Sequence, residues 1–177
     1  MVKNKVNVMI LKSERLILRP WKESDAEALY ELAKNPKIGP VAGWPPHKSV
    51  EESLNIINTV FSKRETYAIV KDSHPIGCVG LLFGDDANHE WGEGSAELGY
   101  WIGEEYWGKG YAFEASQALI KKAFSELNVK RIFASYRIEN TQSKRVLEKL
   151  GFEYLREMKN TNYLNEEFRE TAMILEY

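Results

Sequence analysis

Residues 97–124 read ELGYWIGEEYWGKGYAFEASQALIKKAF. The segment passes from a strand-like pattern, through a short loop that contains Gly108 and Gly110, into a helix-like pattern. The N-terminus of a helix presents unpaired backbone N–H groups and a partial positive charge. Glycine lets such a backbone approach an anion closely. The junction therefore predicts either a phosphate site or a tight turn, and the loop alone does not separate the two.

Two other phosphate-binding motifs do not fit this loop. The chain contains no G-x-x-x-x-G-K-[ST] segment of the kind that binds nucleoside triphosphates. The dinucleotide fingerprint needs glycine or alanine where this sequence has Phe113. That fingerprint also follows the first strand of its domain, whereas here three predicted strands and two predicted helices come first.

Length and composition predict one soluble domain over residues 1–177. The hydrophobic fraction is 44% and the charged fraction 28%, which are ordinary values for a globular protein. A net charge of −2 gives no reason to expect nucleic-acid binding. No stretch approaches the roughly 20 apolar residues of a membrane span. With one cysteine, Cys78, and no apolar signal-peptide core near the start, we expect a cytoplasmic protein without an internal disulfide.

The hydrophobic pattern predicts the element order βααβββαβαββ. Two capping boxes, Ser24–Glu27 and Ser49–Glu52, are expected to open the first two helices. Prolines and glycines predict an irregular loop over 36–48. The single strand–helix–strand crossover requires a parallel strand pair, so we expect an α/β sandwich with a mixed sheet. The expected strands are 14–21, 65–71, 75–84, 96–103, 130–137, 152–159 and 167–176, and the expected helices are 24–35, 49–63, 110–127 and 141–150.

Two motifs resemble those of the GNAT superfamily of N-acetyltransferases. The frame E-Y-W-G-K-G at 105–110 resembles the family motif [Q/R]-x-x-G-x-[G/A]. The segment NTQSKRVLEKLGF at 140–152 resembles the family's N-x-x-[A/S] helix followed by K-L-G-F. The phrases RLILRP, GWPP, ELGYWI and YWGKGYAFEA are similar to those of the branch that contains ribosomal-protein N-terminal (alanine/serine) acetyltransferases. The resemblance extends over the whole chain from residue 14 onward.

The resemblance implies a fold and a co-substrate. The fold is a mixed, mostly antiparallel twisted sheet of about seven strands, with helices on both faces and one central splayed parallel pair. The co-substrate is acetyl-CoA, with no metal: backbone amides of residues 107–112 wrap its diphosphate, and its pantetheine arm lies between the strands 99–102 and 130–137. The implied contacts are Tyr100, Trp101, Ile102, Trp107, Gly108, Lys109, Gly110, Tyr111, Ala112, Asn140 and Ser143.

Some of these residues have an ordinary structural alternative. Asn140 is also a favoured helix cap, and both roles can hold at once. Lys109 and Arg145 are either phosphate contacts or solvated charges. Glu105 stands where the family prefers Gln or Arg, and we exclude it from the site because a carboxylate repels a phosphate.

Amine acetylation needs a proton acceptor and benefits from a proton donor to the leaving thiolate. Glu97, on the same strand face as Trp101, is the candidate base, acting directly or through water; Glu139 and His47 are weaker candidates. Many members of the family that this sequence resembles carry a tyrosine that acts as the proton donor at the position where this chain has Leu147. Ser143 can donate a hydrogen bond to the sulfur instead, or be only a CoA ligand or a residue of the first helical turn.

The acceptor amine is the least determined part of the prediction. Trp44 and Glu97, with the loop 36–48 and the hairpin 84–95, are expected to wall its pocket. The branch resemblance points to a protein N-terminus, while the acidic hairpin favours cationic acceptors. A small amine (a polyamine, aminosugar or aminoglycoside) and a non-catalytic CoA-binding module remain as alternatives. A homodimer is left open.

Two rival sites are less consistent with the sequence. A covalent acyl-enzyme would use Cys78 with His74, but residues four apart in a strand lie roughly 13 Å apart. The polar residues Asp85, Asp86, His89 and Glu90 could mimic a metal site. They have no recognised ligand spacing, so we expect a solvated loop.

Overall fold

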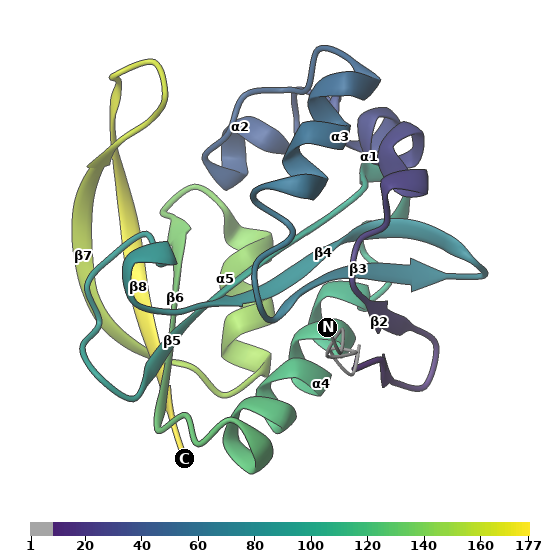
Figure 1. Ribbon diagram of the computed structural model, residues 1–177. Helices are drawn as coiled ribbons and strands as arrows, with labels where there is room; N and C mark the ends of the chain where they lie inside the picture. Colours follow the sequence, from purple (N-terminus) through teal and green to yellow (C-terminus); the bar gives the residue numbers. More distant parts are fainter. Residues whose placement is uncertain (1–8) are drawn as a thin grey trace, which may run out of the picture.

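The computed structural model describes residues 9–177 and contains one eight-stranded sheet in the order β1-β2-β3-β4-β5-β6-β8-β7 (Figure 1). All neighbours are antiparallel except β5 and β6, which are parallel as predicted. The strands are β1 Leu11–Lys12, β2 Ile17–Arg19, β3 Thr66–Lys71, β4 His74–Leu82, β5 Ser95–Ile102, β6 Arg131–Arg137, β7 Glu153–Thr161 and β8 Glu167–Glu176. The helices are α1 Ala26–Ala33, α2 Gly39–Ala42, α3 Val50–Asn58, α4 Tyr111–Glu126 and α5 Thr141–Lys149.

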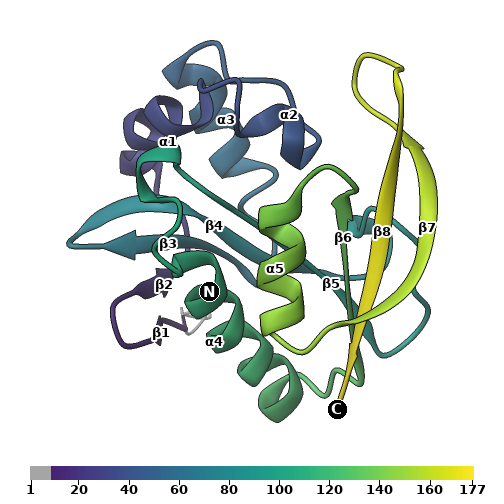
Figure 2. The same ribbon diagram turned by 180° about the vertical axis from the view of Figure 1, so that it is seen from behind.

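Helices cover both faces of the sheet (Figure 2). The larger core lies on the α4 and α5 side, where Leu119 and Leu147 are fully buried with Ile69 and Val79 of the sheet. The smaller core lies on the other face, where α1 and α3 pack over β3 and β4. The strand residues that these helices cover alternate with Ile69 and Val79, so their side chains point to the opposite face. This two-sided arrangement confirms the predicted α/β sandwich.

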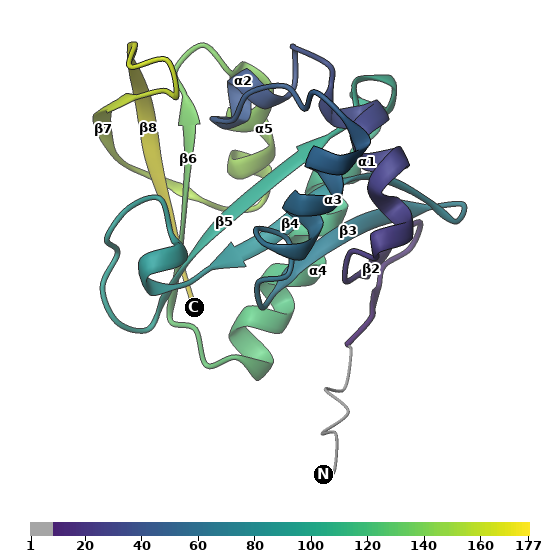
Figure 3. The ribbon, with the colours of Figure 1, turned by 45° about the horizontal axis from the view of Figure 1, so that its top comes forward.

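The parallel pair β5–β6 is short. Its register runs only from Ser95 opposite Arg131 to Glu97 opposite Phe133. Beyond these residues the two strands separate, and Figure 3 shows their arrows diverging from a common start. Beyond the point where they separate, each strand stays paired with its other neighbour, β5 with β4 and β6 with β8. The sheet therefore contains a wedge-shaped gap at its centre, as the resemblance implied.

The N-terminal part differs from the prediction in detail. Only the three residues of β2 form a strand within the predicted range 14–21. The additional short strand β1 precedes that range and pairs with β2, which accounts for the eighth strand. The predicted capping box at Ser24 is wrong: a 3₁₀ turn, Glu23–Asp25, precedes α1. Asp25 accepts a hydrogen bond from the Lys22 backbone N–H at 2.9 Å and pairs with Arg19 at 2.7 Å. The ion pair therefore holds Asp25, the residue that immediately precedes α1, against β2.

The second helix also ends earlier than expected. Ser49 does cap α3, because its hydroxyl accepts from the Glu52 backbone N–H at 3.1 Å. However, α3 ends at Asn58 instead of continuing to residue 63. The loop 36–48 contains the single-turn helix α2, which Gly43 closes in the left-handed conformation with φ 96°. Short helices of this kind depend on tertiary packing, which pattern alone does not reveal.

A buried polar cluster ties α4 to the sheet. Lys122 of α4 donates to Glu65 at 2.5 Å and to the Tyr67 hydroxyl at 2.9 Å, and Tyr67 donates to Glu65 at 2.7 Å. All three side chains are buried. Because each donor and acceptor is paired with another, the cluster holds the helix that starts at the glycine loop.

The cluster is expected to depend on pH at both extremes. Burial raises the pKa of Glu65, but hydrogen bonds from Lys122 and Tyr67 outweigh it, so the pKa lies below its ordinary value. Burial lowers the pKa of Lys122, but Glu65 and Tyr67 raise it above its ordinary value. The stabilisation is therefore present between the ordinary pKa values of the two groups, roughly 4.3 and 10.4. It is lost as the pH falls through the folded pKa of Glu65 or rises through that of Lys122.

We expect Lys122→Met to lower the free energy of unfolding by about 3–5 kcal/mol, because it removes the buried cation that pairs with Glu65. Among the described residues, the carboxylate would keep only the Tyr67 hydroxyl and the exposed Arg64 side chain, at 2.7 and 3.5 Å. The double variant Glu65→Gln/Lys122→Met removes that charge and should recover much of the loss. Urea denaturation at neutral pH measures both. If the single and double variants are equally destabilised, the loss of stability in Lys122→Met does not come from the uncompensated charge of Glu65.

Candidate active site

A large cleft opens where β5 and β6 separate. Its volume is about 1320 Å³. The lining comes from both sides of the gap: the loop 37–44, strands β4, β5 and β6, the glycine loop, helices α4 and α5, and the β7–β8 hairpin. The cleft brings together most of the predicted site residues, which come from four separate segments of the sequence: residue 44 and the ranges 97–102, 107–112 and 140–143.

The glycine loop presents a row of unused backbone donors. Gly108 and Gly110 adopt the left-handed conformation, with φ 72° and 79°. Within the described residues, no hydrogen bond is made by the backbone N–H groups of 108–113. The Trp107 N–H, in contrast, donates to the Glu104 carbonyl at 3.1 Å, so it is already used. The free series therefore starts one residue later than expected, and it can receive a diphosphate at the start of α4.

Arg15 braces this loop from the segment between β1 and β2. Its Nη1 donates to the Lys109 carbonyl at 3.0 Å, and its Nε pairs with Glu114 at 2.7 Å. Ser13 donates to the same carboxylate at 2.7 Å. Holding the Lys109 carbonyl orients the peptide groups around it, and Arg15 adds positive charge beside the free amides. Sequence reasoning missed this contact, because nothing in the RLILRP motif indicates its partner.

The backbone of β5 also faces the gap at alternate residues. The Gly103 N–H donates to the Ile76 carbonyl at 2.8 Å, which directs Gly103 toward β4. Since alternate residues of an antiparallel strand face the same neighbour, Trp101 also faces β4 and Tyr100 and Ile102 face the gap. The Ile102 carbonyl is occupied by the Trp107 indole at 2.7 Å. The Tyr100 peptide groups remain as the pairing point for an extended ligand.

Asn140 and Ser143 meet at the start of α5. The Asn140 side-chain oxygen accepts from the Ser143 backbone N–H at 3.0 Å, so Asn140 is the helix cap. Its side-chain NH₂ has no partner among the described residues and lines the cleft. Asn140 can therefore cap the helix and donate to a ligand at the same time.

A tyrosine hydroxyl reaches Ser143 from the opposite side of the cleft. The Tyr100 hydroxyl lies 2.9 Å from the Ser143 Oγ. Burial raises the pKa of Tyr100 to about 12, and the hydrogen bond with Ser143 offsets this only in part. Tyr100 is thus a neutral hydroxyl donor at physiological pH. The buried Leu147 occupies the helix position where the family carries its tyrosine.

Glu97 lies in the cleft but is held by the loop before β5. The residue is 3% exposed. Oε2 accepts from the backbone N–H of Asn88 and His89 and from the Trp91 indole, at 3.0, 3.3 and 2.7 Å. Among the described residues, Oε1 accepts only from the Asn88 side chain, at 2.6 Å. Glu97 therefore fixes residues 88–91 and keeps acceptor capacity on one oxygen.

Other predicted residues lie away from the cleft. His47 is buried against Ser53, with Nδ1 2.8 Å from its hydroxyl, and burial lowers its pKa. Glu139 and the Lys109 side chain are not among the lining residues. The Lys109 ammonium instead donates to the Glu105 carbonyl at 2.9 Å. Arg145, by contrast, does line the cleft from α5.

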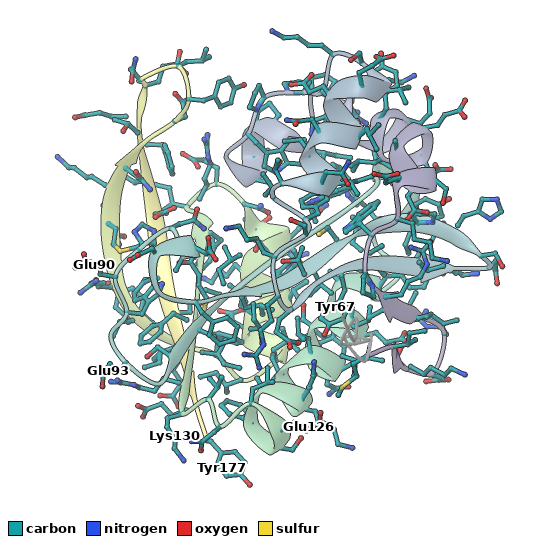
Figure 4. All side chains as sticks on the ribbon, in the orientation of Figure 1. Tyr67, Glu90, Glu93, Glu126, Lys130 and Tyr177 are labelled. Carbon is teal, nitrogen blue, oxygen red and sulfur yellow. The ribbon has the colours of Figure 1, made fainter. Side chains whose placement is uncertain are left out.

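On the acceptor side, Trp44 lines the cleft, and its ring contacts that of Trp101 edge-on at 5.6 Å. The acidic hairpin residues do not enter it. Asp86 pairs with Lys63 at 2.9 Å, and Glu90 is exposed at the outer margin of the molecule, as Figure 4 shows. The hairpin charge therefore does not line the pocket and gives no reason to expect a cationic acceptor.

The rival nucleophile does not suit covalent catalysis. Burial raises the pKa of Cys78 to about 12, which disfavours the thiolate. His74 is exposed at the β3–β4 turn, and its Nδ1 lies 2.8 Å from the Asp72 carbonyl. Within residues 9–177 no group of three or more His, Cys, Asp or Glu side chains is placed to hold a metal ion. No helix in the same range has the length and hydrophobicity to span a bilayer.

One pair of cleft residues was not anticipated. His89 Nε2 lies 2.7 Å from Glu170 Oε1 of β8, and both side chains line the cleft. His89 belongs to a polar loop that is distant in sequence from Glu170, so no local sequence pattern indicates the pair. It joins the loop before β5 to the far side of the cleft.

Comparison with known proteins gives the class. The family described as acetyltransferase (GNAT) domain matches residues 15–153. N-acetyltransferase p20 of Bacillus licheniformis is 32% identical over 150 residues, covering 81% of this chain and 82% of the relative. The ribosomal-protein-serine acetyltransferase of Escherichia coli is 27% identical over 169 residues (91% and 92%), and its spermidine N(1)-acetyltransferase is 25% identical over 154 residues (86% and 80%).

Solved structures agree with this result. A GNAT-family acetyltransferase from Bacillus anthracis superposes with a TM-score of 0.82 at 27% identity, covering 95% of this chain and 98% of that one. The ribosomal L7/L12 α-N-protein acetyltransferase RimL, solved with coenzyme A, shares the fold with a TM-score of 0.79 at 22% identity (95% and 98%). This chain belongs to the GNAT acetyltransferase family, whose co-substrate is acetyl-CoA.

The glycine loop allows a matched test. We expect Gly108→Ala to weaken CoA binding about tenfold, because its methyl group meets no protein atom within 4 Å and can occupy the space that the anion needs. Gly84→Ala is the control: its φ is also positive, its methyl group also meets nothing within 4 Å, and it does not line the cleft. Both changes introduce similar backbone strain, about 1–2 kcal/mol. Calorimetric titration with CoA should show weaker binding to Gly108→Ala than to Gly84→Ala. Equal CoA affinities of the two variants would show that the glycine loop is not part of the binding site.

Proposed function

We propose that this protein transfers the acetyl group of acetyl-CoA to a primary amine, the N-terminal amino group of a protein, by direct attack in a ternary complex. The observation that carries the proposal is the cleft of about 1320 Å³, which joins the free amides of 108–113 to the gap between β5 and β6. The size of the cleft suits both a nucleotide-bearing co-substrate and a polypeptide end. The similarity to a ribosomal-protein-serine acetyltransferase supports the same acceptor class.

Three groups are proposed to hold acetyl-CoA. The amides of 108–113 receive the diphosphate, with Arg15 beside them. The Tyr100 peptide groups pair with the amides of the pantetheine arm as a neighbouring strand would. The Asn140 side-chain NH₂ donates to a carbonyl of that arm. Bound in this way, acetyl-CoA supplies an activated thioester that is open to an amine from the Trp101 face of the sheet.

Proton transfer on the acceptor side is assigned to Glu97, directly or through water. An α-amino group has an ordinary pKa near 8, so a modest acceptor is sufficient to maintain the free base. Glu97 Oε1 accepts only one hydrogen bond in the structure, from Asn88, and can bind the water or the amine. The other three hydrogen bonds, all to Oε2, keep the carboxylate in place.

Stabilisation of the leaving thiolate is assigned to Ser143 and Tyr100 together. The Ser143 hydroxyl donates toward the sulfur, while the Tyr100 hydroxyl, 2.9 Å away, orients it and can replace the proton. The missing helical tyrosine at Leu147 is thus replaced by a tyrosine from strand β5. Because the pKa of Tyr100 is raised to about 12, its proton is retained until a stronger base forms nearby.

Small amines are the second candidate acceptor, favoured by the similarity to spermidine N(1)-acetyltransferase. A non-catalytic CoA-binding module is the third. Incubation with acetyl-CoA and a panel of amines, followed by mass spectrometry, distinguishes the three. We expect a mass increase of one acetyl group on N-terminal serine or alanine peptides and not on spermidine or aminosugars. Acetylation of small amines alone would replace the proposed acceptor, and CoA binding without any product would indicate the non-catalytic module.

We expect Tyr100→Phe and Ser143→Ala each to lower kcat about 100-fold, the lower end of the range for general acid catalysis. The KM for acetyl-CoA should change less than threefold. Because the two hydroxyls act as one unit, the double variant should be little slower than the slower single variant. Thiol release followed by a colorimetric reagent measures all three. Multiplicative losses in the double variant would show two independent roles.

A further inference from the structure

A cationic side chain faces the acceptor side of the cleft without a partner. Arg137 is the last residue of β6 and lines the cleft. Within the described residues its guanidinium forms no salt bridge, and its buried Nη2 has no hydrogen-bond partner. A buried donor without an acceptor is costly, so a group that supplies an acceptor at this point gains binding energy.

Strand alternation places Arg137 on the substrate face. Phe133 and Arg137 share one side of β6, and the Phe133 ring stacks on Trp91 at 4.3 Å, beside Glu97. The residues of β6 that alternate with them belong to the core under α4 and α5. Arg137 therefore lies on the same face as the proposed base, opposite the side on which Asn140 and Ser143 begin α5.

The neighbouring carboxylates are already engaged. Glu170 is the cross-strand partner of Arg137, yet it pairs with His89 at 2.7 Å and accepts from Asn160 at 3.4 Å. Glu97 accepts four hydrogen bonds from residues 88–91. Among the described residues, neither carboxylate forms a salt bridge with the guanidinium.

The guanidinium is also held in position. It lies over the Phe168 ring, with its central carbon 4.1 Å from the ring centroid. A guanidinium stacked on an aromatic ring keeps its N–H edge free and in a fixed orientation, which suits two-point recognition of an oxyanion. The other cleft cations lie elsewhere: Lys37 pairs with Glu104, and Arg145 and Lys149 are on α5.

We propose that Arg137 binds an oxyanion, a carboxylate or a phosphate group, on the amine that is acetylated. The inference rests on the proposed function and narrows its acceptor class. For a peptide, the group is an acidic side chain close to the N-terminus. For a small molecule, it is an acid carried by the amine itself. Cationic acceptors such as polyamines are disfavoured, because they would be brought against the guanidinium.

The test compares matched acceptors. Peptides that begin with serine and carry one aspartate at position two, three or four are paired with the same peptides carrying asparagine. Phosphoethanolamine is paired with ethanolamine, and glutamate with its diamide. We expect kcat/KM to favour the acidic member of at least one pair about 10- to 100-fold, the range of a hydrogen bond between charged groups. No preference in any pair would overturn the proposal.

Variants separate recognition from folding. Arg137→Met should reduce the preference to about one while leaving kcat for the neutral member within threefold, and Arg137→Lys should retain part of it. Arg131→Met is the matched control, because Arg131 is on the same face of β6 but does not line the cleft. Its guanidinium donates to the Glu93 carbonyl at 3.4 Å. If Arg137 is only structural, Arg137→Met will slow both members of each pair equally.

Equilibrium binding measurements distinguish a failure of the oxyanion site at Arg137 from a failure of the proposed acetyltransferase function. Calorimetric titration of CoA-saturated protein with the acidic and neutral peptides requires no turnover. Tighter binding of an acidic peptide that disappears in Arg137→Met supports the oxyanion site even if acetylation is slow. If amines are acetylated but the acidic and neutral peptides of each pair bind with equal affinity, the acetyltransferase function stands and the role of Arg137 is refuted.

Discussion

The brief pairing of β5 with β6 is the constraint on which the cleft depends. The two strands share a register only at 95–97 with 131–133. Each is then held by its other neighbour, since β5 pairs with β4 up to Ile102 and β6 with β8 up to Arg137. The gap cannot close without breaking one of these ladders. It therefore exposes strand backbone inside the molecule, where an extended ligand can pair with it.

The neighbouring features are consistent with this geometry. The glycine loop follows β5 after one 3₁₀ turn, Glu104–Tyr106, and its free amides line the same cleft as the gap. The buried Glu65–Lys122–Tyr67 cluster holds α4, and Arg15 holds the loop before it. Across the gap, α5 starts at the end of β6 and brings Asn140 and Ser143 to the same cleft. Rigid elements thus position both sides of the site.

Much of this arrangement could be predicted from local pattern. Alternating hydrophobicity located six of the eight strands well, and the double glycine indicated the loop because only glycine readily adopts a positive φ without strain. Pattern failed where tertiary contacts decide the outcome. The start of α1 depends on the ion pair of Asp25 with Arg19, and α2 is one turn that no periodicity reveals. The end of α3 was also predicted too late, at residue 63 instead of Asn58.

The site shows the same division. Gly108, Gly110, Asn140 and Ser143 lie in short motifs and could be found from sequence. The contact of Tyr100 with Ser143 joins residues 43 positions apart, and the His89–Glu170 and Arg15–Glu114 pairs are also long-range. Such pairs depend on sheet order and helix placement, which motif spacing does not specify. The electrostatics of the acceptor side therefore became visible only with the fold.

Residue-resolved NMR with and without CoA tests the central claim most directly. The claim is that the backbone donors of 108–113 and of Tyr100 are held open in the free protein and are used by CoA. Their amide hydrogens should exchange rapidly in the free protein, then shift and gain protection when CoA is added, while amides within the β4–β5 ladder remain unchanged. Unchanged exchange and chemical shifts at 108–113 in CoA-saturated protein would contradict the account.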